Sequence, residues 1–224
     1  MTMTKYSRIT KYTISLFLFV LFALPLSVFS QDHKPPLPVE LLFGHDHLYF
    51  QMVLKKQFTP ESRLGFFSVA TYSAKYNDLS DVDITLPMHL YYDVWKGFSV
   101  IGGGAINSVT GFSPYAGFEH NFASRQVLTV TQVNFSLDSH NDFTLFGIYE
   151  YKPPINENWS LFTHLQLLYN TSFKDGAHNR SYLYLRAGIS RGSIGFGLGA
   201  NLDQYGPYKT YEDNYGLFVM YEFR

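Results

Sequence analysis

The chain contains no cysteine, little charge and only one long apolar run. Without cysteine no disulfide can form, so a secreted fold of this size needs another source of stability, such as a closed hydrogen-bonded barrel. Charged residues make up 16% of the sequence and the formal net charge is −1, which excludes the basic surface typical of nucleic-acid binding. Aromatic residues reach 18%, above the usage typical of soluble domains, and they favour strands and membrane interfaces.

The single apolar run lies at the N-terminus, at residues 14–24, after a start that carries three basic residues and no acidic one. The run is shorter than the ~20 residues that a membrane-spanning helix needs. Together with a plausible cleavage position after Ser30, these features predict a secretory signal peptide over residues 1–30. The mature domain is then expected to cover residues 31–224.

The mature chain alternates apolar and polar residues with a period of two, which predicts strands. The clearest stretch places seven apolar side chains on one face, at Val82, Ile84, Leu86, Met88, Leu90, Tyr92 and Val94. The opposite face of that stretch carries Asp83, His89 and Asp93. We count eleven such segments, at residues 46–57, 61–73, 82–95, 98–107, 112–122, 125–137, 141–151, 158–170, 180–190, 193–203 and 213–223.

An even number of strands is required if both termini lie on the periplasmic side of a bacterial barrel. Residues 39–44 can supply a short first strand, which makes twelve; ten remains the alternative if two weak segments are not separate strands. The intervening segments alternate between tight turns and longer ones, such as 74–81 and 204–212. We therefore expect an all-β, closed antiparallel transmembrane β-barrel, with a soluble antiparallel barrel as the competing fold.

The last ten residues place aromatic and apolar side chains at alternate positions, ending with Tyr221 and Phe223 before Arg224. This ending resembles the C-terminal assembly signal of Gram-negative outer-membrane β-barrel proteins, with Tyr221 and Phe223 as its aromatic residues. Position 219 holds a valine and not a tyrosine, so Val219 adds no aromatic residue to the signal. Gln31 after the cleavage site is similar to proteins of the Bacteroidota.

The resemblance is to a class and not to one family. It implies location in the cell outer membrane, contact with outer-membrane lipid, and recognition by the outer-membrane assembly machinery.

If the apolar face meets lipid, the other face lines the barrel interior and carries charges of both signs. These side chains can form ion pairs that brace a structural barrel, or they can form a narrow channel for small polar solutes. The expected interior polar residues are Lys55, Arg63, Asp83, His89, Asp93, Glu119, Glu150, His164, Gln166, Arg186 and Glu222.

Other residue clusters suggest alternative functions. The run 45–47 offers two histidines and an aspartate but no evident fourth ligand, so neither a metal nor another cofactor is expected. Ser172, Asp175 and His178, and also residues 138–140, contain the side-chain types of a hydrolase, which leaves a lipid acyltransferase or deacylase as an alternative. Tyrosines within and beside 204–212 leave open a barrel that binds a ligand at the surface.

Overall fold

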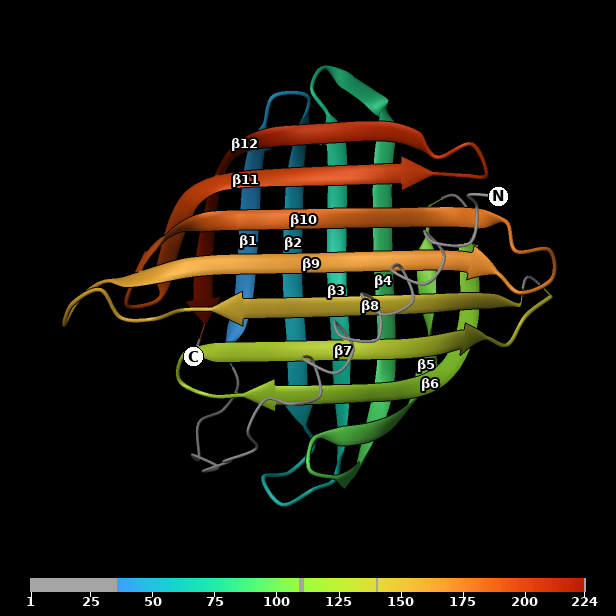
Figure 1. The fold of residues 1–224 in the computed structure, drawn as a ribbon, viewed down its shortest axis with the longest axis horizontal. Coiled ribbons are helices and arrows are strands. Elements are labelled where there is room, and N and C mark those ends of the chain that lie inside the picture. Colours follow the sequence, from blue (N-terminus) through green and yellow to red (C-terminus); the bar gives the residue numbers. More distant parts are fainter. Residues whose placement is uncertain (1–35, 109–110, 140, 224) are drawn as a thin grey trace, which may run out of the picture. The chain divides into compact units, whose positions relative to one another are not determined.

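The computed structural model describes residues 36–108, 111–139 and 141–223; the predicted signal peptide lies outside the described residues. The described chain forms antiparallel strands joined by short connections (Figure 1). Their bounds are β1 Leu37–Gly44, β2 His47–Gln57, β3 Leu64–Lys75, β4 Asp78–Trp95, β5 Phe98–Asn107, β6 Gly111–Ala123, β7 Val127–Ser136, β8 Asp142–Tyr151, β9 Ser160–Ser172, β10 His178–Arg191, β11 Ile194–Tyr205 and β12 Thr210–Phe223.

Each strand pairs with its neighbours in sequence, and β1 also pairs with β12, which closes the barrel. The closing register runs from Leu37 opposite Phe223 to Gly44 opposite Gly216. Closure leaves no edge strand, so every strand finds hydrogen-bond partners on both sides. The expected closed antiparallel barrel with twelve strands is confirmed, including the short first strand at 39–44.

The strands extend further than the apolar pattern predicted. β4 already begins at Asp78, β11 continues to Tyr205 and β12 begins at Thr210, so the segments 74–81 and 204–212 are mostly strand and not loop. Polar residues continue these ladders because backbone pairing requires no apolar side chain. The prediction of long external loops was therefore wrong for these two segments.

The end of β12 presents an outward row made of Val219, Tyr221 and Phe223, all of them exposed. The aromatic part of this row begins only at Tyr221, because position 219 is a valine and no tyrosine stands there. Val219 instead pairs opposite Leu41 on β1 and Phe196 on β11, as part of the apolar outer surface. The aromatic residues of the predicted assembly signal are therefore limited to Tyr221 and Phe223.

The barrel has two ends, which we name by the chain termini. The terminal rim carries the start of β1 and the end of β12, and the opposite rim carries the β1–β2 connection. By the class rule for bacterial barrels, the terminal rim faces the periplasm. In Figure 1, β8–β12 form one wall and β1–β4 form the wall behind it, and the strands of the two walls cross at a steep angle. Such a crossing is expected when strands tilt by about 35–45° from the barrel axis.

The outer surface is apolar. Leu198 is 68% exposed, Phe118 62% and Leu217 61%, and all three occupy outward positions in the middle of their strands. Ile84 and Leu90, from the clearest alternating stretch, are also exposed. A soluble barrel would turn these side chains inward, so the exposed apolar surface is typical of an outer-membrane barrel.

In the described part of the chain, no helix has both the length and the apolar character needed to cross a membrane.

The barrel interior contains two hydrophobic clusters as well as polar side chains. The larger cluster includes Phe67, Tyr91, Ile101 and Phe146, and the smaller one includes Leu42, Tyr49, Phe162, Tyr184, Phe218 and Met220. Glycines make room for some of these rings: a Cβ on Gly65 would lie within 2.3 Å of the Tyr91 ring. The interior is thus filled by large side chains between its charged groups.

Candidate solute pathway

The interior carboxylate of Glu119 is the centre of a polar cluster in the half of the barrel formed by β2–β7. Its side chain is fully buried and accepts a hydrogen bond from Lys55 Nζ at 2.8 Å and one from Gln132 Nε2 at 2.8 Å. His89 Nε2 lies 3.2 Å from the same carboxylate, and His89 Nδ1 lies 3.0 Å from the hydroxyl of Tyr115. A buried charge with this many partners is stabilised because each donor replaces water that burial removed.

A second cluster lies deep in the interior at Arg186. Its Nη2 is 2.7 Å and its Nε 2.8 Å from Glu40 Oε1, while Nη1 donates to Asn201 Oδ1 at 2.9 Å. Arg186 and Glu40 are almost completely buried. The guanidinium therefore joins β1, β10 and β11 through charge-assisted hydrogen bonds.

A third cluster occupies the interior toward the opposite rim, around Arg180. This guanidinium pairs with Asp83 at 3.1 Å and with Asp203 at 3.0 Å. The hydroxyls of Tyr184 and Tyr205 lie within 3.4 Å and 3.0 Å of Arg180 Nη2. Since Asp83 comes from β4 and Asp203 from β11, Arg180 links the two walls of the barrel.

The fourth cluster lies at the terminal rim. Lys152, just after β8, donates to Glu222 at 2.6 Å and pairs with Glu150 at 2.8 Å, while His164 Nδ1 lies 3.0 Å from Glu150. Burial alone would lower the pKa of Lys152, but the two carboxylates beside it raise that pKa above its ordinary value. Lys152 is therefore protonated at neutral pH and holds β8 to β12.

Three of these clusters form one continuous arrangement, which we call the polar stripe. The register places Tyr184 opposite both Gln166 and Asn201, and Arg186 opposite His164, so the groups follow one another along β9–β11. From the opposite rim to the terminal rim the stripe consists of Asp83, Arg180, Asp203, Gln166, Asn201, Arg186, Glu40, His164, Glu150, Lys152 and Glu222.

Gln166 has the one buried side-chain atom that lacks a hydrogen-bond partner among the described residues. The residue is 0% exposed, its Nε2 donates to the Tyr182 hydroxyl at 3.1 Å, and its Oε1 has no partner. An unpaired buried acceptor costs about 1–3 kcal/mol. A water molecule or a solute hydroxyl at this point would remove that cost.

The structure places most of the expected interior residues inward, at the positions just described. Asp93 also faces the interior, near the terminal rim, and accepts a hydrogen bond from Ser99. Arg63 differs: β3 begins only at Leu64, so Arg63 lies exposed in the connection between β2 and β3. The prediction started this strand too early, at residue 61, because no change in the apolar pattern marks where the turn ends and the strand begins.

Four charged members of the interior clusters were missing from the sequence-based set: Glu40, Lys152, Arg180 and Asp203. Arg180 and Asp203 lie in predicted strands on the same face as Arg186 and Asn201, so strict alternation would have found them. Glu40 lies in the short first strand, opposite Met220. Lys152 lies beyond its strand, and no periodic signal extends to that position.

The residue clusters proposed for other chemistry do not assemble into sites. His178 contacts the Gly206 carbonyl and Ser181, whereas Asp175 accepts from the Ala177 amide, so Ser172, Asp175 and His178 form no triad. Asp46 and His47 pair with each other at 3.2 Å, and the described residues contain no group of three or more side chains suited to a metal ion. Residue 140 lies outside the described residues.

The tyrosines around the last connection are split between the two faces of the barrel. Tyr205 points inward and contacts Arg180, whereas Tyr208 is 96% exposed at the turn. Tyr211 and Tyr215 face outward, with their hydroxyls 3.4 Å apart. They do not converge on one binding surface.

The fold is similar to that of known porins. The KdgM porin covers 84% of this chain and 99% of its own at 11% identity and a TM-score of 0.47. The NanC porin gives the same coverage at 10% identity and 0.48, and OccK5 of Pseudomonas aeruginosa covers 77% of this chain and 67% of its own at 13% and 0.40. No protein-family model and no curated protein matches the chain. The closed barrel, its apolar exterior and its charged interior make this chain an outer-membrane β-barrel protein.

Proposed function

We propose that the protein is a narrow outer-membrane channel for small polar solutes and that the polar stripe is its pathway. The observation that carries this proposal is the succession of charged and amide side chains from Asp83 at one rim to Glu222 at the other. In a low-dielectric interior, a solute that loses water needs such groups to replace its hydration.

The unpaired Oε1 of Gln166 supports this pathway, because it lies in the middle of the stripe and offers an acceptor to a passing donor. Cations and anions alternate along the stripe, with Arg180 between Asp83 and Asp203 and Arg186 beside Glu40. Because the stripe carries five carboxylates and three permanent cations, we expect a weak preference for cations over anions, together with passage of neutral or zwitterionic polar solutes.

Conductance in planar bilayers tests the proposal. Folded protein should give small, discrete conductance steps, and the double variant Glu40→Gln/Arg186→Gln should change their size while keeping both side chains hydrogen-bonding. The double change avoids leaving one buried charge unpaired, which costs about 3–5 kcal/mol. Leu185→Val, an outward position next to Arg186, is the matched control and should conduct as the wild type does.

A second candidate function, a purely structural barrel, is favoured by the two hydrophobic clusters that fill the interior. Under that function the two hydrophobic clusters block passage through the barrel at all times, and the interior ion pairs serve only to hold the strands together. Correctly folded protein that leaves bilayers electrically silent in both wild type and variant would reject the channel in favour of this structural role.

A further inference from the structure

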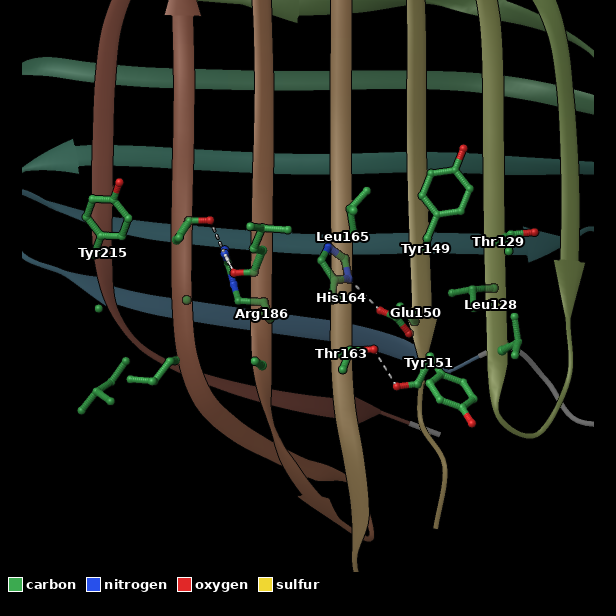
Figure 2. A pocket seen from close by; sticks show the side chains of 18 residues that line it. Leu128, Thr129, Tyr149, Glu150, Tyr151, Thr163, His164, Leu165, Arg186 and Tyr215 are labelled. Atoms are coloured by element: carbon green, nitrogen blue, oxygen red, sulfur yellow. Dashed lines mark hydrogen bonds and ion pairs between the residues drawn. The ribbon is translucent and has the colours of Figure 1, made fainter. Parts of the chain in front are cut away.

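The outer wall formed by β7–β12 contains a groove of about 1100 Å³, separate from the interior pathway. For comparison, ligand pockets in proteins have volumes of about 300–1,000 Å³. Figure 2 shows it crossing the strands, from Tyr215 on β12 to Thr129 on β7. The groove crosses the strands and does not follow one, and every neighbouring pair of strands beneath it is hydrogen-bonded.

Two rows of outward-facing side chains form its walls. The register of the strands aligns one row across all six strands: Tyr215, Ala200, Leu185, Leu165, Tyr149 and Thr129. The second row, one step nearer the terminal rim, is Leu217, Leu198, Ala187, Thr163, Tyr151 and Val127. Small residues at 187 and 200 between larger neighbours leave the hollow.

The groove surface is apolar because several of its hydroxyls are already bonded. Thr163 Oγ1 donates to the Tyr151 carbonyl at 2.9 Å, and the Tyr149 hydroxyl lies 2.9 Å from Thr131 Oγ1 (the Thr163 bond is dashed in Figure 2). The charged residues between the rows, Arg186, His164 and Glu150, turn their side chains to interior partners. A hydrocarbon chain suits this surface, and a polar solute does not.

The groove changes depth as it crosses the barrel. On β12 it lies near the strand centre, at 215–217, and on β7 it reaches the first strand residues, at 127–129, beside the terminal rim. Five strand spacings give a length of about 24 Å. With strands tilted by about 45°, that length spans roughly 17 Å of depth, close to the ~15 Å of one leaflet in a hydrocarbon core of about 30 Å.

A positively charged side chain, Arg125, lies near the end of the groove at the terminal rim. Arg125 is exposed in the β6–β7 connection, two residues before Val127, and it makes no ion pair with any described residue. The neighbouring cation, Lys152, is directed to Glu150 and Glu222 instead. Arg125 is therefore placed to contact a phosphate at the depth where lipid headgroups begin, since guanidinium groups pair well with phosphate.

We propose that this groove binds one phospholipid of the leaflet at the terminal rim, with an acyl chain along the two rows and the phosphate at Arg125. Bulk lipid is as apolar as the groove, so apolar character alone gives no preference. The preference comes from close contact along a shaped surface and from the charge at its mouth. The proposal depends on the membrane location but not on channel activity.

Native mass spectrometry of the full-length mature barrel, extracted in mild detergent and titrated with an anionic phosphoglyceride, tests it. The wild type should retain a single phospholipid. Ala187→Trp fills the groove and should abolish that peak, while Ala70→Trp, an outward alanine on β3, should leave it unchanged. Arg125→Gln should weaken retention by roughly two- to fivefold, as loss of an exposed charge contact does, and Lys174→Gln at the opposite rim should not.

Equal retention by the wild type and Ala187→Trp would overturn the proposal. Selective retention of a lipopolysaccharide would also overturn it, because that result would place the groove in the other leaflet. A lipid-free dimer that Ala187→Trp dissociates would overturn it as well, because the occupant of the groove would then be a second copy of the chain. Bilayer conductance of Ala187→Trp separates this result from the channel proposal, because residue 187 faces outward and its replacement should leave conductance unchanged.

Discussion

At the scale of single residues, the barrel interior depends on complete pairing of buried charge. Glu119 shows this best, since its carboxylate contacts Lys55, His89 and Gln132 and also lies 3.3 Å from Asn121 Nδ2. The two hydrophobic clusters leave little room for water to replace a lost partner. The ion pairs are therefore structural requirements as well as candidate parts of a pathway.

Replacing Glu119 by Ala should lower the free energy of unfolding by about 3–5 kcal/mol, because the partly buried Lys55 would lose its carboxylate and the buried Gln132 would lose its acceptor. Urea titration followed by the heat-modifiable shift in gel mobility measures the effect. Glu157→Gln, at an exposed position in the β8–β9 connection, is the control and should change stability by no more than about 0.5 kcal/mol. An equal effect of the two substitutions would contradict the structural role of the cluster.

At the scale of the strands, the seam between β1 and β12 joins the two ends of the chain and closes the barrel. The inward side chain of Asn214 reinforces it near the opposite rim. Its Oδ1 accepts from the amides of Asp46 and His47 at 3.2 and 3.1 Å, and its Nδ2 donates to the His47 carbonyl at 3.0 Å. Gly44 makes this possible, because a Cβ there would overlap the Asn214 amide.

Asn214→Ala should therefore loosen the β1–β2 turn before the rest of the barrel. The amides of residues 46 and 47 should exchange hydrogen faster, corresponding to about 1–3 kcal/mol of lost protection for donors left without an acceptor. Hydrogen–deuterium exchange resolved by peptide measures this. Asn156→Ala removes a similar turn acceptor at the terminal rim, where Asn156 Oδ1 binds two amides, and should leave the β1–β2 turn unaffected. Faster exchange only at the terminal rim in Asn214→Ala would contradict the assignment.

At the scale of the whole molecule, the outer wall exposes so much apolar surface that the folded barrel would aggregate in water. The chain therefore has to be delivered to a membrane. The signal peptide over residues 1–30 remains a prediction, as does the role of Tyr221 and Phe223 in recognition by the assembly machinery. Both side chains face outward at the end of β12, with their rings 4.7 Å apart, so a recognition partner can reach them before closure. Val219, one outward position earlier on the same strand, offers such a partner apolar surface but no ring.

Expression of the full chain in a Gram-negative host should yield a mature protein that begins at Gln31 and fractionates with the outer membrane. Intact-mass measurement of the membrane fraction checks the cleavage position, since a shorter leader changes the mass by whole residues. Gel migration that differs between boiled and unboiled samples should accompany the processed form. Recovery of an uncleaved chain in the inner membrane would show that the apolar run at 14–24 is an anchor.

The local sequence pattern determined the strand positions and the two faces of the wall. Alternation along β4 predicted that Ile84 and Leu90 face outward and that His89 faces inward, because a strand turns successive side chains to opposite sides. The same rule predicted eleven segments, and the requirement for an even number of strands then added the short β1. It failed at strand ends, where backbone pairing continues without apolar residues, as at Asp78 and Thr210.

Only the tertiary structure decided which charges meet and what fills the space between them. Lys55 and Glu119 are 64 residues apart, and Arg186 and Glu40 are 146 apart, so their pairing depends on strand register and barrel closure. The groove across β7–β12 also arises from register, which aligns one residue from each of six strands in a row. Period-two patterning acts within a strand and contains no information about such rows, because the stagger between neighbouring strands is set by closure of the whole sheet.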